Sequence, residues 1–248
     1  MSFPADMTVS DSIAPTLPPA ISGLEKEEAL AKRFNRNSLF QKDLTFEFTR
    51  EPDFLHQYYK IREVAYNSVW NLTHFSGAEN ESDRKGHILV VRQGNFCVGG
   101  IKLNLKSPRK TDLLPIETGD FRLEKHFPEL QRHQMTYGQF SGFALLQEYH
   151  GGEITIEIMR RLLGKSYALN IDVLFAACPL LNARLYKQYA CTIGFKDIKV
   201  HHDIELPLDP TTEGIRLYLA SGALKDTPTR KRPTLVPETM ISGSLEEA

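Results

Sequence analysis

The chain has 248 residues, 41% of them hydrophobic, which is enough for one sizeable hydrophobic core. Its 30 lysines and arginines almost balance its 31 aspartates and glutamates, so charge gives no reason to expect nucleic acid or an anionic membrane as a partner. The three cysteines lie in apolar contexts without the spacing of metal ligands, which is typical of reduced thiols in a cytoplasmic protein and predicts no metal site. The sequence has no run of 18 apolar residues and no basic-then-apolar N-terminus, so neither a membrane span nor a secretory signal is predicted.

Composition divides the chain into three parts. Residues 1–42 are predicted to be a flexible leader because the first 23 are rich in Ser, Pro, Thr and Ala, although Leu24–Phe34 has the composition of a short helix. Residues 43–207 are predicted to form the folded domain. Residues 208–248 are predicted to be a tail, in which Glu213–Ala220 suits a short helix and the segment beyond it, rich in Pro, Thr and charge, suits disorder.

The predicted domain begins with a strand and a helix. Leu44–Arg50 alternates apolar and polar residues, as a half-buried strand does. Pro52 stands at the early helix position that proline tolerates, and the helix that follows carries Arg62 and Trp70 among its apolar residues. Residues 71–85 are polar and predict a loop.

A hairpin is predicted next. His87–Arg92 and Phe96–Leu105 have the composition of strands, and Gln93-Gly94-Asn95 between them is typical of a tight turn. The adjacent glycines 99 and 100 inside the second strand predict a bulge, or a close approach of another backbone or of a ligand.

The second half of the domain reads as strand, turn, helix, strand, helix and a closing Gly-Phe, over residues 140–146, 147–152, from 154, 171–177, 180–189 and 194–195. The first N–H groups of a helix have no partner within it, and Gly151 and Gly152 would let another molecule approach them closely. The turn therefore suits an anion. The alternative, a plain connection that binds nothing, stays open on the glycines alone.

This order of elements resembles the acyl-coenzyme A binding core of the GNAT acyltransferase superfamily. The resemblance rests on the turn at 147–155, the run Asn182-Ala183-Arg184-Leu185-Tyr186 and Gly194-Phe195. It implies an α/β (α+β) fold of three layers, in which helices flank a central, twisted, mixed but mostly antiparallel sheet.

The first half narrows the resemblance to the autoinducer-synthase-like branch of that superfamily, which includes acyl-homoserine-lactone synthases and long-chain N-acyl amino acid synthases. Arg62 and Trp70, the acidic residues Glu81 and Asp83, and the strand Val98–Leu103 carry this likeness. The resemblance covers about residues 44–197 and implies an insertion at 107–135.

The sequence departs from the superfamily at the turn. His150 replaces an Arg or Gln, Glu153 replaces the central Gly, and Thr155 replaces the last small residue. A glutamate beside a pyrophosphate would repel it, so the turn's usual binding of free coenzyme A is weakened here.

The predicted strand over residues 140–146 and the residue before it also depart from the pattern of the homoserine-lactone synthases. Ser141 and Phe143 match the homoserine-lactone synthase pattern, whereas Gln139 replaces the glutamate proposed as a base and Gly142 replaces an arginine. A neutral amide cannot take a proton from an amine. Lys102 also replaces an arginine, which keeps the charge but not the bidentate fork. Homoserine-lactone synthesis is therefore disfavoured.

The resemblance implies three candidate catalytic residues. Tyr186 would protonate the leaving sulfur, and the neighbouring pattern favours this role over the alternative of a core residue that caps the sheet. Gln139 occupies the position of the base. Glu153 would need a raised pKa to act as one, whereas a helix N-terminus favours its charged form.

Binding residues are implied in two groups. The thioester arm would pair with strand backbone and reach the turn at Phe143, Ala144, Leu145, Leu146, His150, Gly151, Gly152 and Asn182. The acceptor would contact Arg62, Trp70, Asp83, Lys102 and Ser141. Arg62 suits a carboxylate of the acceptor, but a structural ion pair with Asp83 or Glu81 is an equal alternative.

We therefore expect a cytoplasmic GNAT-fold N-acyltransferase that moves an acyl group from a thioester to the amine of a small molecule such as an amino acid. The donor is expected to be acyl-CoA or acyl-acyl carrier protein (acyl-ACP), with no permanently bound cofactor. The weakened turn favours the carrier protein. Two alternatives stay open: acetyl transfer from acetyl-CoA to a small amine or protein, and a non-catalytic GNAT-fold regulator that binds an acylated ligand.

Overall fold

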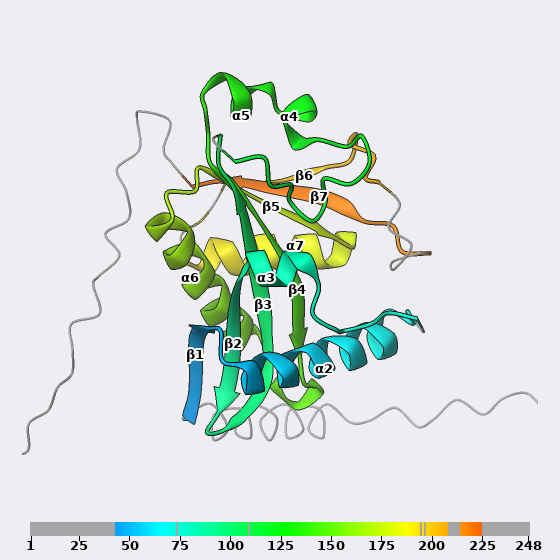
Figure 1. Cartoon of the computed structure of the whole chain (residues 1–248), viewed down its shortest axis with the longest axis vertical. Coiled ribbons are helices and arrows are strands. Elements are labelled where there is room, and N and C mark those ends of the chain that lie inside the picture. The colour runs from blue at the N-terminus through cyan, green and yellow to red at the C-terminus, as the bar shows by residue number, and fades with distance from the viewer. Residues whose placement is uncertain are drawn as a thin grey trace, which may run out of the picture. The chain divides into compact units, whose positions relative to one another are not determined.

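The computed structural model describes residues 43–72, 74–108, 110–193, 195, 197–207 and 214–224. The predicted leader, 1–42, and the predicted disordered end after residue 224 lie outside these residues. The described part contains a seven-stranded sheet in the order β1-β2-β3-β4-β5-β7-β6 (Figure 1). Its strands are β1 (Leu44–Thr49), β2 (His87–Gln93), β3 (Phe96–Lys106), β4 (Tyr137–Leu145), β5 (Val173–Cys178), β6 (Ile198–His201) and β7 (Tyr218–Ala223).

The described helices are α2 (Pro52–Val69), α3 (Glu81–Lys85), α4 (Leu123–His126), α5 (Pro128–Arg132), α6 (Gly152–Ala168) and α7 (Leu180–Thr192), with a 3-10 turn at Gln147–Tyr149. Among them, none combines the length and apolarity that a membrane crossing requires.

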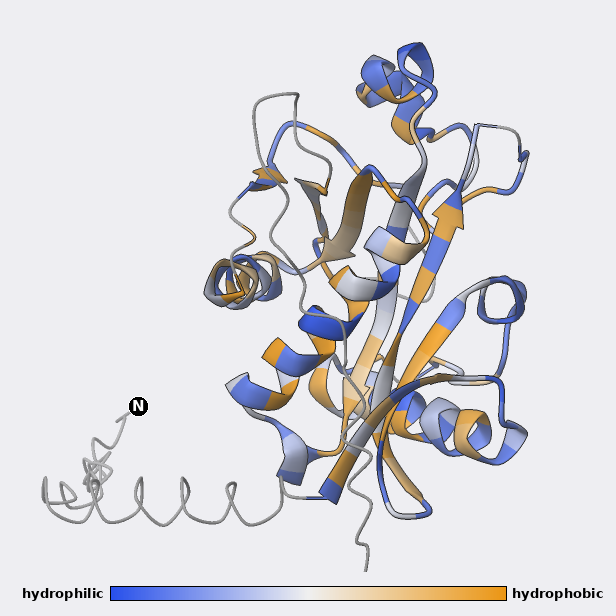
Figure 2. Cartoon of the chain, turned by 90° about the vertical axis from the view of Figure 1, so that its left-hand side faces the viewer, coloured by the Kyte–Doolittle hydropathy of each residue, from blue (hydrophilic) through white to orange (hydrophobic). Residues whose placement is uncertain are grey.

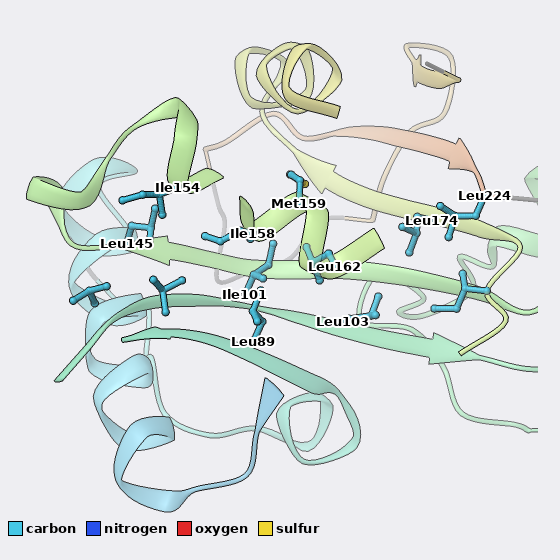
Figure 3. Packing of buried hydrophobic residues seen from close by; sticks show 13 residues of the cluster. Leu89, Ile101, Leu103, Leu145, Ile154, Ile158, Met159, Leu162, Leu174 and Leu224 are labelled. Atoms are coloured by element: carbon cyan, nitrogen blue, oxygen red, sulfur yellow. The ribbon is translucent and has the colours of Figure 1, made fainter. Parts of the chain in front are cut away.

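Helices cover both faces of the sheet. On β2, Ile88 and Val90 pack in one cluster with Tyr58 of α2, whereas Leu89 packs with Ile158 of α6. Alternate strand residues point to opposite faces, so α2 and α6 lie on opposite sides (Figure 1). Figure 3 shows the α6 side, where a continuous apolar layer joins α6 to the strands through residues such as Ile101, Leu145 and Leu162. The predicted mixed, mostly antiparallel sheet between helices is confirmed.

The insertion 107–135 packs against β4, β5 and β7 through a hydrophobic cluster of its own. Its helices α4 and α5 lie together at one end of the described region and are mainly hydrophilic (Figure 2), while Leu123 and Leu130 bury their side chains against Tyr137 and Phe175. The carboxylate of Glu117 holds the loop by accepting from the backbone N–H groups of Leu114 and Leu123 and from Lys106.

Three predictions about this chain's elements are wrong. The predicted helix Glu213–Ala220 and the domain end at residue 207 fail because Tyr218–Ala223 is β7, which lies between β5 and β6 in the sheet. Leu217 and Leu219 alternate with polar or small residues, and pairing on both sides makes this alternation a strand. The predicted loop 71–85 ends in α3, because Asn80 and Asp83 form a capping box.

Candidate functional site

The site begins where β4 and β5 separate. These parallel strands pair only over Tyr137–Gln139 and Val173–Phe175, and beyond that point they diverge. On its other side β4 carries a bulge against β3, because Ser141 pairs with Lys102 and Ala144 with Gly100, which leaves two residues of β4 opposite one of β3. The strands therefore leave an opening in the sheet beside an irregular stretch of β4.

Gly142 makes this bulge possible. Its φ is 69°, a conformation that residues with a side chain rarely adopt. A Cβ here would lie 2.7 Å from the hydroxyl of Tyr58, which donates a hydrogen bond of 2.6 Å to the Gly142 carbonyl. The arginine that the resemblance would place at this position cannot fit without moving Tyr58.

A cavity of about 140 Å³ fills the opening between β4 and β5, and we call it the cleft cavity. It is lined by Ala65, Tyr66, Val69 and Trp70 of α2 and its end, Phe140 to Leu145 of β4, His150, Ala176 to Cys178 of β5, and Asn182 and Tyr186 of α7. The cleft cavity thus has walls from both faces of the sheet.

A second cavity of about 230 Å³ lies on the α2 face, and we call it the cation cavity. It is lined by Arg62, Tyr66, Trp70, Phe75, Asn80, Ser82, Lys102, Pro115, Ile116, Thr118, Gln139, Ser141, Gly142, Ala177, Leu206, Pro207 and Leu217. This lining contains two cationic side chains and no carboxylate. Five residues line both cavities: Tyr66, Trp70, Ser141, Gly142 and Ala177.

A buried ion cluster supports the wall of the cation cavity. The guanidinium of Arg62 donates to both oxygens of Asp83, at 2.8 and 2.9 Å, and to the carbonyl groups of Gly77 and Ala78. The ammonium of Lys102 donates to Asp83 at 2.7 Å and to the Ser82 hydroxyl at 2.6 Å. Of the two roles proposed for Arg62, the structure contains the ion pair with Asp83.

The charges within this cluster shift the pKa values of Asp83 and Lys102. Burial alone would raise the pKa of Asp83, but the hydrogen bonds and charge of Arg62 and Lys102 outweigh burial and lower it to about 2. Burial lowers the pKa of Lys102, and the charge of Asp83 opposes this effect. Two cations against one carboxylate leave a formal net charge of +1. An ammonium has three donors, of which two bond to Ser82 and Asp83, so Lys102 has one donor left at the cavity wall.

Three further residues named from the sequence line this cavity too: Gln139, predicted at the position of the base, and Ser141 and Trp70, predicted to contact the acceptor. Gln139 is 4% exposed, and its side-chain oxygen accepts from the Ile116 N–H at 2.9 Å. It therefore holds the insertion over the cavity, where the resemblance predicted a base. The Ser141 hydroxyl is buried and has no hydrogen-bond partner among the described residues. Trp70 packs against Tyr66, with ring centroids 4.7 Å apart.

Tyr186 and Asn182 lie on the α7 side of the cleft cavity. The Tyr186 ring meets Phe140 and Phe143 edge-on, at 5.7 and 6.2 Å between centroids. Burial raises the pKa of Tyr186, with further contributions from Cys178 and Tyr66 nearby, while a hydrogen bond with Asn182 opposes the rise. The phenol therefore keeps its proton at neutral pH, as an acid must.

The predicted donor-binding residues separate into two groups. Phe143, Ala144, Leu145, His150 and Asn182 line the cleft cavity. His150 bonds through Nε2 to the Leu145 carbonyl at 3.0 Å, so it ties the turn to β4.

Leu146, Gly151, Gly152 and Glu153 line neither cavity. The Leu146 N–H is already paired with the Val98 carbonyl at 2.9 Å. Glu153 is exposed on the first turn of α6, which removes the geometric support for its role as a base. Among the described residues, no group of three His, Cys, Asp or Glu side chains could hold a metal ion.

Sequence reasoning missed Tyr66 and Cys178. Tyr66 stands four residues after Arg62 and four before Trp70, and this spacing places all three on one stripe of α2. This stripe could have indicated from the sequence that Tyr66 belongs to the site. Cys178 ends β5, and burial raises its pKa to about 12, so it stays a neutral thiol in the cleft wall.

The layered sheet with its splayed β4–β5 pair is the GNAT fold that the sequence predicts. No family model and no curated protein sequence matches the chain. Among solved structures, it is similar to FeeM, an N-acyl amino acid synthase from uncultured soil microbes, with a TM-score of 0.55, 10% identity, and coverage of 73% of this chain and 91% of that chain.

Two further solved structures match over a similar extent. The AHL synthase LasI has a TM-score of 0.46 and 16% identity, over 73% of this chain and 89% of that chain. An acetyltransferase from Streptococcus agalactiae 2603 has a TM-score of 0.47 and 13% identity, over 73% and 99%. At such identities the likeness concerns the fold.

Proposed function

We propose that this protein is an N-acyltransferase that moves an acyl group from a thioester in the cleft cavity to the amine of an amino acid in the cation cavity. The observation that carries the proposal is that the two cavities meet at five shared residues, in the opening between β4 and β5. Acyl transfer requires a thioester carbonyl and an amine to meet within bonding distance.

The cation cavity favours an acceptor that carries a carboxylate. Its wall has a formal net charge of +1 from Arg62, Asp83 and Lys102, and its lining has no acidic side chain. Lys102 would donate its remaining N–H to that carboxylate. A polyamine would meet repulsion at the same wall, and a protein lysine would bring no carboxylate beside its amine.

The cavities on the side of the thioester donor favour an acyl chain that is longer than acetyl. An apolar cavity of about 40 Å³ adjoins the cleft cavity and shares Phe140, Ala176 and Tyr186 with it. The first carbons of a longer chain can enter there. Exposed Glu148 and Glu153 near the start of α6 would repel the pyrophosphate of free coenzyme A, which favours a carrier protein as donor.

The chemistry would proceed in two steps. The amine nitrogen attacks the thioester carbon, and the carbonyl electron pair moves to its oxygen. That pair then returns and the C–S bond breaks. The leaving thiolate takes a proton from the Tyr186 phenol, which burial keeps protonated. The proton that the product nitrogen loses then passes through water to the Tyr186 phenolate and restores the phenol.

Matched acceptor pairs test the proposal. The purified protein is incubated with acyl-ACP or acyl-CoA and either an amino acid or the amine left by its decarboxylation, and thiol release and acylated product are measured. We expect transfer to the amino acid and much less to the amine. Lys102→Met should raise KM for the amino acid about tenfold and leave KM for the amine unchanged. Absence of transfer from both donors contradicts the function, and equal use of both acceptors contradicts the carboxylate site.

A further inference from the structure

We propose that Tyr66 is a catalytic residue whose phenol donates a hydrogen bond to the thioester carbonyl oxygen as that oxygen becomes an oxyanion. The inference rests on the function proposed above and assigns the donor that its first step needs. Oxyanion stabilisation requires a donor that is already in place before the reaction.

The position of Tyr66 identifies the atom it can serve. The carbonyl carbon must lie where the cleft cavity meets the cation cavity, because the acyl group arrives from one and the amine from the other. Of the five residues shared by the two cavities, Tyr66, Trp70 and Ser141 have side-chain donors. Ser141 lines both cavities, but its hydroxyl is buried and exposes almost no surface to a substrate. Tyr66 and Trp70 therefore remain.

The contacts of Tyr66 distinguish it from Trp70. Its ring lies between Phe75, stacked at 4.5 Å, and Trp70, tilted at 4.7 Å, so two neighbours hold it. Its hydroxyl lies beside the Gly142 backbone at the β4 bulge, where the two cavities meet.

The Gly142 carbonyl already accepts from Tyr58 at 2.6 Å, so the Tyr66 phenol proton can donate into the opening instead. Burial raises the pKa of Tyr66 to about 12, against the charge of Arg62, so the phenol is a donor and not a base at neutral pH.

The two tyrosines divide the reaction between them. Tyr186 lies on α7 and lines the cleft cavity but not the cation cavity, so it faces the sulfur of an arriving thioester. Tyr66 lies on α2 at the junction of both cavities, so it faces the carbonyl oxygen. When the amine forms the C–N bond, the carbonyl electron pair resides on an oxygen bound to Tyr66. It returns as the C–S bond breaks and the sulfur takes the Tyr186 proton.

Tyr66→Phe tests this assignment because it removes one oxygen and keeps the stacked ring. We expect kcat to fall about 100-fold, while KM for both substrates and the melting temperature stay near their original values. Tyr59→Phe is the matched control. Tyr59 is a buried tyrosine of the same helix, its hydroxyl has no partner among the described residues, and it lines neither cavity, so its loss should leave kcat unchanged.

Thioesters with different leaving groups distinguish the role of Tyr66 from that of Tyr186. The defect of Tyr186→Phe should shrink when an alkyl thioester is replaced by a more acidic aryl thioester, because that thiolate needs no proton. The defect of Tyr66→Phe should stay the same, because the oxyanion forms with either. An active wild-type protein whose Tyr66→Phe variant matches Tyr59→Phe overturns the inference alone. A wild-type protein that transfers no acyl group overturns the proposed function and this inference with it.

Discussion

Replacing Gly142 with alanine should damage the site through the backbone. The new residue would have to keep a φ of 69°, which costs roughly 1–2 kcal/mol for a residue with a side chain. Its Cβ would lie 2.7 Å from the Tyr58 hydroxyl, so that hydroxyl must move and lose its 2.6 Å hydrogen bond to residue 142. A hydrogen bond contributes about 1 kcal/mol. The sum is roughly 2–3 kcal/mol of unfolding free energy.

Chemical denaturation measures this loss, and a thermal scan should show a fall of about 5–10 °C. Gly94→Ala is the matched control. Gly94 has a φ of 57°, but a Cβ there has no neighbour within 4 Å, so this variant carries the backbone cost without the clash. It should lose roughly 1–2 kcal/mol only.

Tyr58→Phe tests whether the clash with Tyr58 explains why Gly142→Ala should lose more stability than Gly94→Ala. In the Gly142→Ala background it removes the atom that clashes, so the double variant should be more stable than the sum of the two single losses by about 1 kcal/mol. Strict additivity, or equal losses at Gly142 and Gly94, would refute the reasoning, since both would mean that Tyr58 does not constrain the bulge. The Gly142→Ala variant should also lose acyl transfer, because Gly142 belongs to the wall that the two cavities share.

Three further predictions follow from charge and burial. Because the pKa of Asp83 falls from 3.8 to about 2 on folding, its contribution of about 2 kcal/mol is present above pH 4 and is lost as the pH falls through 2, which urea titrations across this range can measure. Gln139→Glu keeps an acceptor for the insertion's backbone but adds negative charge to the cation cavity, so acceptor KM should rise with little loss of stability. At pH 8 a thiol reagent should label exposed Cys191 first, while burial raises the pKa of Cys97 to about 11 and that of Cys178 to about 12 and delays both until unfolding.

The layered core could be predicted from the sequence because its periodicity is local. In α6, the apolar residues Ile154, Ile158 and Leu162 recur every four positions, and they are the residues that pack on the sheet. β7 could not be recognised in the same way. It is short and rich in Ala, Ser and Gly, and its strand conformation depends on pairing with β5 and β6, which are distant in sequence.

The site could be predicted in composition but not in arrangement. Arg62, Asp83 and Lys102 were all named from the sequence, yet the choice between a substrate contact and an ion pair depends on contacts across 19 to 21 residues. The structure uses the Arg62 fork for Asp83 and leaves a donor on Lys102, which moves the proposed carboxylate contact from one cation to the other. Periodicity indicates which face a residue occupies, and it does not indicate its partner.

The absence of a carboxylate from the lining of both cavities leads to a last prediction, about pH. With no such base, the acceptor must arrive as a free amine, so kcat/KM should rise tenfold per pH unit up to the pKa of the acceptor's own ammonium group. His150 is the imidazole in the cleft lining, and its Nε2 is bound to the Leu145 carbonyl. His150→Gln should therefore leave the profile unchanged. A wild-type profile that changes in His150→Gln would show instead that the imidazole takes the proton.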